Sequence, residues 1–313
     1  MQKVVAVVGP TASGKTGLSI AIAKRFGGEV VSADSMQIYH QMNIGTAKPS
    51  MEERDGVPHH LMGHISVEET YNVASYVGDA RRLLAELEEE NCLPVLCGGT
   101  GLYLDHLLGN TDFFDIPVKD EVRKKYQEMA RTQGNAAIFS LLQERDPTLA
   151  AHLHCNDGKR IIRGLEVLET TGRRLSDFQA ESTRQSPYEV LYIGLNYKDR
   201  TILYDRINRR VDQMMEQGLL QEVLQLIENY RLSDTARAAI GYKELLDALE
   251  SGGDLTAAVE LIKQKSRNYA KRQLTWFRKN EDIHWFYPDE QDGNALKNDV
   301  FNIIETFLKG GAL

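Results

Sequence analysis

The stretch GPTASGKT at residues 9–16 decides the fold of this chain. It fits the pattern G-x-x-x-x-G-K-[ST], and it follows KVVAVV at 3–8, a valine-rich run typical of a buried parallel strand. The segment LSIAIAKRF at 18–26 has the apolar spacing of a helix. A strand, a glycine-rich loop and a helix in this order predict a phosphate-binding loop, because the backbone N–H groups of such a loop point at phosphate oxygens.

This loop predicts a site for a phosphate or a diphosphate. Its N–H groups and the dipole of the following helix attract an anion. Lys15 adds a mobile positive charge, and the Thr16 hydroxyl is a ligand suited to Mg²⁺, which we expect as the cofactor. The residues expected to surround the diphosphate are Gly9, Pro10, Thr11, Ala12, Ser13, Gly14, Lys15 and Thr16.

Further strands are predicted on both sides of this loop in the sequence. EVVSA at 29–33 and LPVLC at 93–97 are short apolar runs, and residues 189–196 and 283–287 have the same character. They alternate with helical patterns such as 72–90. This alternation predicts an α/β fold, a P-loop NTPase-like parallel sheet flanked by helices.

The pattern between the strands predicts how the chain divides into domains. Residues 43–60 hold two glycines and two prolines and are expected to form a loop with short turns. Residues 112–187 show mostly helical periodicity and are expected to form a helical insertion in a core domain of 1–111 and 188–313. Helices are expected at 118–132, 135–144, 157–171 and 175–181, and again at 199–216, 218–230, 241–250, 255–279 and 294–308.

The composition is that of a globular protein. Of 313 residues, 42% are hydrophobic and 26% charged, and no run of about 18 apolar residues predicts a membrane span. The cysteines Cys92, Cys97 and Cys155 show neither CxxC spacing nor a Cys/His cluster. We therefore expect a reducing cytoplasm rather than a zinc site or disulfides. A polar loop is the expected setting of His59, His60 and His64.

The charge distribution leaves a nucleic-acid partner open. The net charge of −8 would ordinarily count against one. Locally, however, residues 263–279 hold seven Lys/Arg and no acid, and residues 159–174 hold five Lys/Arg against two Glu. Each run is either a solvated helix face or a surface for an anionic partner.

Three classes of protein fit the phosphate loop: a small-molecule kinase, a nucleotide-driven motor or switch, and a transferase with a diphosphate leaving group. Motor ATPases usually end a second apolar strand in an acid, but LPVLC at 93–97 runs into glycines and Thr100. The acid that ends an early strand is Asp34, in VVSADSMQIY at 30–39. It is either a turn residue or, one βα unit after the loop, a partner for the reacting group.

Several segments together resemble the tRNA dimethylallyltransferases, also called tRNA isopentenyltransferases. D-S-x-Q-x-Y followed by G-T-A-K-P, and KRQxTWFR near the end, are far more specific than the phosphate loop. The matching blocks are GPTASGKT, SADSMQIYHQMNIGTAKP, PVLCGGTGLYL, NDGKRIIRGLEVLETTG, IGYKE and KRQLTWFR, in the family's order from residue 9 to 278. The C-terminal region has no cysteine pairs of the kind found in the zinc fingers of eukaryotic members, so it resembles the bacterial form.

The resemblance implies a reaction. A dimethylallyl group moves from dimethylallyl diphosphate to N6 of adenosine 37, beside the tRNA anticodon, and diphosphate leaves with the help of Mg²⁺. By resemblance, Asp34 is the base that accepts the N6 proton. Thr11 and Thr100 line the same site, and Arg206 and Arg210 fall where the family places an arginine near the diphosphate. The sequence does not choose between these two arginines.

The resemblance also implies tRNA contacts. The target base must leave the anticodon-loop stack, and the Gln37 amide could form a bidentate contact with adenine. Alternatively, Trp276 and the stripe beginning at Ile161 could simply belong to hydrophobic cores. The residues expected to contact tRNA are Asp34, Ser35, Met36, Gln37, Thr100, Arg123, Lys159, Arg160, Ile161, Ile162, Arg163, Arg237, Ala238, Ala239, Ile240, Gly241, Tyr242, Lys271, Arg272, Gln273, Leu274, Thr275, Trp276, Phe277 and Arg278.

Three other functions remain as alternatives. A cytokinin-type adenylate dimethylallyltransferase, which acts on AMP, ADP or ATP, would share the phosphate loop and the base. The helical insertion and the basic run 263–279 favour tRNA, because a mononucleotide needs neither. A small-molecule kinase would not release diphosphate without nucleotide hydrolysis. A non-enzymatic RNA-binding module would tolerate the loss of Lys15. A monomer is expected.

Overall fold

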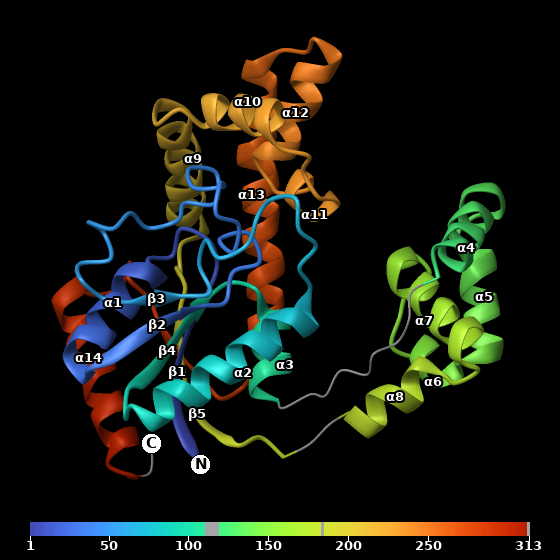
Figure 1. Cartoon of the computed structure of the whole chain (residues 1–313). Coiled ribbons are helices and arrows are strands. Elements are labelled where there is room, and N and C mark those ends of the chain that lie inside the picture. The colour runs from blue at the N-terminus through green and yellow to red at the C-terminus, as the bar shows by residue number, and fades with distance from the viewer. Residues whose placement is uncertain (110–118, 183–184, 312–313) are drawn as a thin grey trace. The chain divides into compact units, whose positions relative to one another are not determined.

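The computed structural model describes residues 1–109, 119–182 and 185–311. The chain divides into two compact units: a core unit of Met1–Leu108 with Ser186–Leu313, and a helical unit of Gly109–Gln185 (Figure 1). The expected insertion, 112–187, overlaps the helical unit, and its first boundary, between 111 and 112, lies outside the described residues. No helix in the described part of the chain is long and apolar enough to cross a membrane.

The core unit is built on one parallel sheet, as predicted. Its six strands follow the order β3-β2-β4-β1-β5-β6, with β1 near the middle. The strands are β1 (Gln2–Val8), β2 (Gly28–Ser32), β3 (His59–His60), β4 (Leu93–Gly98), β5 (Tyr188–Leu195) and β6 (Ile283–Phe286). Five of them confirm the predicted strands. The sixth, β3, lies in the stretch expected to be a loop, because two residues paired with Val30 and Val31 are too short to show a pattern.

Helices cover both faces of this sheet. Alternate residues of β1 point to opposite sides: Val4 belongs to the core beneath α2 (Val73–Glu89) and α3 (Gly101–Leu108), and Val5 to the core beneath α1 (Lys15–Phe26) and α14 (Gly293–Leu308). Figure 1 shows the two helix layers. Because neither face of its buried part meets water, β1 is apolar at every position from Val4 to Val8 and does not alternate with polar residues there.

A group of helices extends the core unit beyond the sheet (Figure 1). The long helix α13 packs against α9 and α12. Side chains from these helices and from the segment after β2, including Ile38 and Met42, share one hydrophobic core. This packing brings the segment after β2 against the helices. The helices are α9 (Arg200–Glu216), α10 (Leu219–Asn229), α11 (Asp234–Arg237), α12 (Tyr242–Ser251) and α13 (Leu255–Phe277).

The helical unit has its own core, built around Tyr126, Ile138, Leu142 and Leu165. Among the described residues 119–182 no strand occurs, in agreement with the sequence pattern. The first predicted helix, 118–132, is confirmed as α4, although residue 118 lies outside the described part. The helices are α4 (Asp120–Gln133), α5 (Asn135–Arg145), α6 (Pro147–Ala150), α7 (Gly158–Thr171) and α8 (Leu175–Ser182).

Candidate functional site

The predicted phosphate loop lies between β1 and α1, at the carboxyl end of the central strand. Ala12 has φ 62°, a left-handed conformation that is strained for a residue with a side chain and typical of functional loops. Lys15 Nζ donates to the Pro10 carbonyl at 2.6 Å. Burial lowers the pKa of Lys15 to about 8. Ser13 Oγ is buried and has no hydrogen-bond partner in the described part of the chain.

A cavity of about 420 Å³ opens beside this loop. Arg206 Nε donates to the Ala12 carbonyl at 3.0 Å, and Arg210 Nη1 donates to Thr11 Oγ1 at 3.4 Å. The structure thus brings both candidate arginines to the loop and adds Arg209, which the sequence analysis missed. No carboxylate of the described residues lines this cavity, so its chemistry suits an anion. The lining residues are Ala12, Ser13, Gly14, Lys15, Thr16, Arg206, Arg209, Arg210 and Gln213.

A second cavity of about 290 Å³ adjoins the first. The two share Lys15, Thr16 and Arg210 in their linings. The second contains Asp34 and also has apolar lining residues, among them Ile207, Val211, Met214 and Ile262. An anionic group and a small apolar group could therefore bind next to each other. Residues 238–242, which resemble a tRNA-contact block, line this cavity as well.

One carboxylate oxygen of Asp34 is engaged in a local turn. Oδ1 accepts the backbone N–H groups of Met36 and Gln37 at 2.9 and 3.3 Å, which is the local turn role. Oδ2 has no hydrogen-bond partner in the described part of the chain. Lys15 and Asp34 both line the second cavity. Asp34 can thus hold its turn and still accept a proton.

The segment after Asp34 borders the same cavity. The Ser35 N–H donates to Thr100 Oγ1 at 3.1 Å, which connects this segment to the turn after β4. Gln37 Nε2 donates to the carbonyls of Thr46 and Ala47 at 3.1 and 3.3 Å. Both amide hydrogens of Gln37 are therefore engaged within the protein. The predicted bidentate contact of Gln37 with adenine would require at least one of these bonds to break.

Gln273 has a role that the sequence analysis missed. Its side chain is 5% exposed. Oε1 accepts the Thr11 N–H at 2.8 Å, and Nε2 donates to the Gly99 carbonyl at 3.0 Å. A Cβ atom at Gly99 would lie 1.9 Å from Nε2, so any larger residue would displace the Gln273 amide from this position. Gln273 joins the phosphate loop to the turn after β4, and its amide is not free for the tRNA contact expected of it.

Replacing Gln273 with leucine is expected to weaken binding of inorganic diphosphate about tenfold. The change leaves the half-buried Thr11 N–H and the buried Gly99 carbonyl without their partners, at up to about 1–3 kcal/mol each, and releases the loop. Isothermal titration calorimetry measures the affinity. Gln264→Leu, the same change at an exposed position of α13, is the control. Equal affinities for the two variants would contradict this role.

The C-terminal half of α13 has two kinds of face. Leu274 and Phe277 are buried in hydrophobic cores, and Trp276 Nε1 donates to Asp105 Oδ2 at 2.8 Å. These three side chains hold the helix against the rest of the core unit. Leu274 and Phe277 were expected to contact tRNA, and their burial corrects that expectation. The exposed residues are Lys271, Arg272 and Thr275 on this half of α13, with Arg278 and Lys279 directly after the helix.

Helix α7 of the helical unit also has one exposed, basic face and one buried, apolar face. Lys159 and Arg160 are exposed in the first turn of α7, whereas Ile161 is fully buried in the core of the unit. Ile161 therefore does not present a side chain to tRNA, and the core interpretation of this stripe holds for it. Arg123 and Arg163 both donate to Oε2 of the buried Glu166, at 3.1 and 3.0 Å. This carboxylate sets the position of both guanidinium groups.

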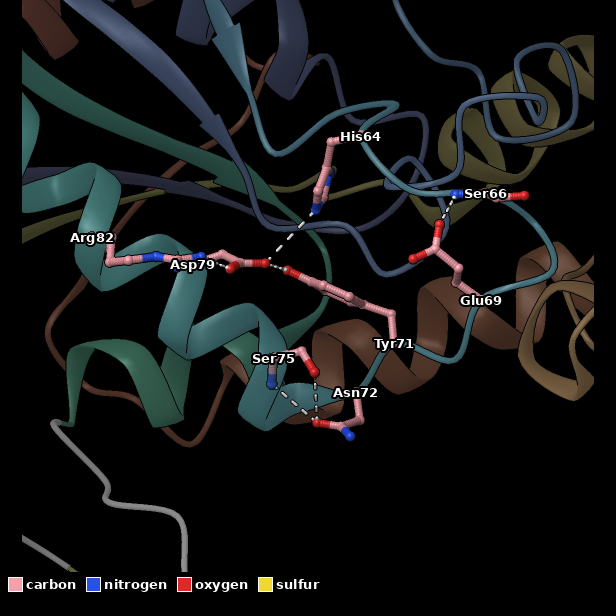
Figure 2. Close-up of polar contacts among 8 residues, drawn as sticks. All are labelled: His64, Ser66, Glu69, Tyr71, Asn72, Ser75, Asp79 and Arg82. Atoms are coloured by element: carbon pink, nitrogen blue, oxygen red, sulfur yellow. Dashed lines mark hydrogen bonds and ion pairs between the residues drawn. The ribbon is translucent and has the colours of Figure 1, made fainter. Parts of the chain in front are cut away.

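His60 and His64 contact nearby carboxylates. His60 Nε2 lies 2.5 Å from Glu29 Oε2. His64 Nε2 lies 4.0 Å from Asp79 Oδ2, to which the Tyr71 hydroxyl donates at 2.7 Å (Figure 2). Within the described ranges no group of three His, Cys, Asp or Glu side chains could hold a metal ion. His60 and His64 therefore make local polar contacts.

Comparison with known proteins gives a consistent result. The IPP transferase family model matches residues 37–280. The curated tRNA dimethylallyltransferase of Caldanaerobacter subterraneus subsp. tengcongensis is 43% identical over 311 residues, 98% of this chain and 99% of that protein. That of Acetivibrio thermocellus is 45% identical over 302 residues, 95% of this chain and 96% of that protein.

Solved structures agree with this similarity. The full-length tRNA isopentenylpyrophosphate transferase of Bacillus halodurans has a TM-score of 0.75 and 41% identity, with 99% of this chain and 98% of that chain covered. A eukaryotic dimethylallyltransferase described as acting on tRNA has a TM-score of 0.81 and 30% identity, with 100% of this chain and 81% of that chain covered.

Proposed function

The chain belongs to the IPP transferase family of tRNA dimethylallyltransferases, and we propose that it transfers the dimethylallyl group of dimethylallyl diphosphate to N6 of adenosine 37 in tRNA. One observation carries this proposal. The cavity lined by cations shares Lys15 and Arg210 with the cavity that holds Asp34 and apolar residues. A diphosphate, an isoprenoid group and an adenine amine could therefore meet within one continuous site.

The residues divide the chemistry among them. As the bond between the allylic carbon and the diphosphate oxygen breaks, the loop N–H groups, Lys15 and Arg210 stabilise the charge that develops on the leaving group. The adenine amine forms the new bond to the same carbon. Its proton passes to Asp34 Oδ2, which has no other partner among the described residues. The apolar lining surrounds the dimethylallyl group and keeps water from the developing cation.

The site also fits the proposed cofactor, Mg²⁺. Thr16 borders both cavities, and its hydroxyl is the kind of oxygen ligand that Mg²⁺ prefers. Bound there, the ion would neutralise further charge on the diphosphate. Lys15 and the three arginines would still orient the diphosphate through their own hydrogen bonds.

The basic surfaces are proposed to hold the anticodon stem-loop. Lys271 and Arg272 on α13 and Arg278 directly after it are exposed, as are Lys159 and Arg160 on α7. Such contacts position an RNA backbone, and their strength falls as salt rises. We further propose that the protein acts as a monomer in the cytoplasm, where tRNA is present.

A transfer assay tests the proposed function directly. Labelled dimethylallyl diphosphate with Mg²⁺ is expected to label unmodified tRNA, and replacing the target adenosine with guanosine is expected to abolish the label. AMP and ATP serve as competing acceptors in parallel reactions. Label on AMP or ATP alone would contradict the tRNA proposal and favour the adenylate dimethylallyltransferase. Tight tRNA binding without product would favour the RNA-binding module.

A further inference from the structure

A single carboxylate holds the loop that follows the Asp34 segment. Glu222 on α10 accepts the backbone N–H groups of Asn43 and Ile44 on Oε2, both at 2.9 Å. Oε1 accepts the Gly45 N–H at 3.2 Å and the Tyr242 hydroxyl as well. Three consecutive backbone N–H groups thus converge on one side chain, an arrangement that favours a negative charge.

This loop forms part of the wall of the cavity with Asp34. Gly45 and Thr46 line that cavity. The carbonyls of Thr46 and Ala47 accept both amide hydrogens of Gln37, which lines the same cavity. The position of the loop therefore decides where the Gln37 amide lies. Glu222 itself is not part of the lining, so it acts on the cavity through the loop and through Tyr242, which also lines the cavity.

Contacts from Tyr242 and Lys48 also fix the position of loop 43–47. Tyr242 is 1% exposed, and a Cβ atom at Gly45 would lie 2.4 Å from its ring, so only glycine allows this approach. Directly after the loop, Lys48 Nζ donates to the Tyr39 carbonyl at 2.6 Å and to Asn43 Oδ1 at 2.9 Å. The loop is thus held by charged or buried side chains at both ends.

We infer that Glu222 is a positioning residue for recognition of the target base: loop 43–47 holds Gln37 Nε2 and thereby orients Gln37 Oε1, which can accept a hydrogen from the base without breaking those bonds. The inference rests on the proposed function, because the base is the adenosine of tRNA. A neutral glutamine at this position would turn one acceptor oxygen into an N–H₂ group that faces backbone N–H groups. The loop would then move, and the Gln37 amide would lose its fixed orientation, while the phosphate loop would keep its own contacts.

The test compares Glu222→Gln with Glu228→Gln, a matched change at an exposed position of the same helix. Glu222→Gln is expected to lower kcat/KM for tRNA by about 10- to 100-fold, which is the loss of one or two hydrogen bonds to a charged group. The KM for dimethylallyl diphosphate is expected to stay within about twofold of wild type. Hydrogen exchange at the amides of residues 43–45 is expected to accelerate. Glu228→Gln is expected to match wild type.

Tyr242→Phe is a second, milder variant that removes one donor and keeps the ring. It is expected to raise the KM for tRNA a few-fold and to leave the KM for dimethylallyl diphosphate unchanged. This variant keeps the inference testable if Glu222→Gln does not fold. Equal losses for both substrates would show that Glu222 only stabilises the fold and would overturn the inference, as would unchanged kinetics despite faster exchange. A wild-type enzyme that does not label tRNA would instead overturn the proposed function.

Discussion

Replacing Asp34 with asparagine is expected to lower kcat by about 10²- to 10⁴-fold, the usual contribution of a general base. The turn contacts and the proposed proton transfer use different oxygens of Asp34. Asparagine keeps an acceptor for the Met36 and Gln37 N–H groups, which now bond to Oδ1. It cannot take the N6 proton with its second group. Rapid-quench measurement of a single turnover with bound tRNA gives the rate of the chemical step.

A comparison with Asp34→Ala isolates the turn. Alanine removes the base and also releases the two backbone N–H groups, so we expect a similar loss of kcat with a somewhat larger loss of thermal stability. The Kd for tRNA, measured by filter binding, is expected to change little in Asp34→Asn. Near-normal turnover in Asp34→Asn would rule out the role as base. A large loss of tRNA affinity with unchanged single-turnover rate would assign Asp34 to binding instead.

The local parts of the fold and the site were predictable from the sequence. Residues 9–16 form a contiguous motif, and the apolar runs that became β1, β4 and β5 are long enough to show their character. The two-residue strand β3 and the four-residue helix α11 are too short to carry a periodic signal. They form because neighbouring elements supply their partners, which is information that a local pattern does not contain.

The missed residues share a physical reason. The contact of Thr11 with Gln273 joins residues 262 positions apart, and that of Ile44 with Glu222 joins residues 178 apart. No spacing rule connects such pairs before the chain is folded. Ile161, in contrast, was assigned to tRNA contact because it lies inside a motif. Its helical spacing with Leu165 was the better guide, because a motif does not tell which face of a helix is buried.

Replacing Lys15 with methionine is expected to lower kcat/KM for dimethylallyl diphosphate by about 10³-fold. The change removes a charge-assisted contact to the diphosphate, and such a contact strengthens as the leaving group gains charge. Methionine keeps the length and most of the volume of the side chain, so the loop is expected to hold its shape. Steady-state kinetics at saturating tRNA measure the effect. A loss below about tenfold would show that the arginines bind the diphosphate without Lys15.

The lowered pKa of Lys15 makes its role visible in a pH profile. Because burial brings this pKa to about 8 in the free enzyme, kcat/KM for dimethylallyl diphosphate is expected to fall as pH rises through 8. In the bound complex the diphosphate favours the ammonium form, so the fall in kcat is expected at higher pH. The unfolded chain binds the proton of Lys15 up to its ordinary pKa of 10.5. The free energy of unfolding of the unliganded wild type should therefore rise, relative to Lys15→Met, between about pH 8 and 10.5. A flat kcat/KM profile across pH 8 would show that the ammonium group is not the one that recognises the diphosphate.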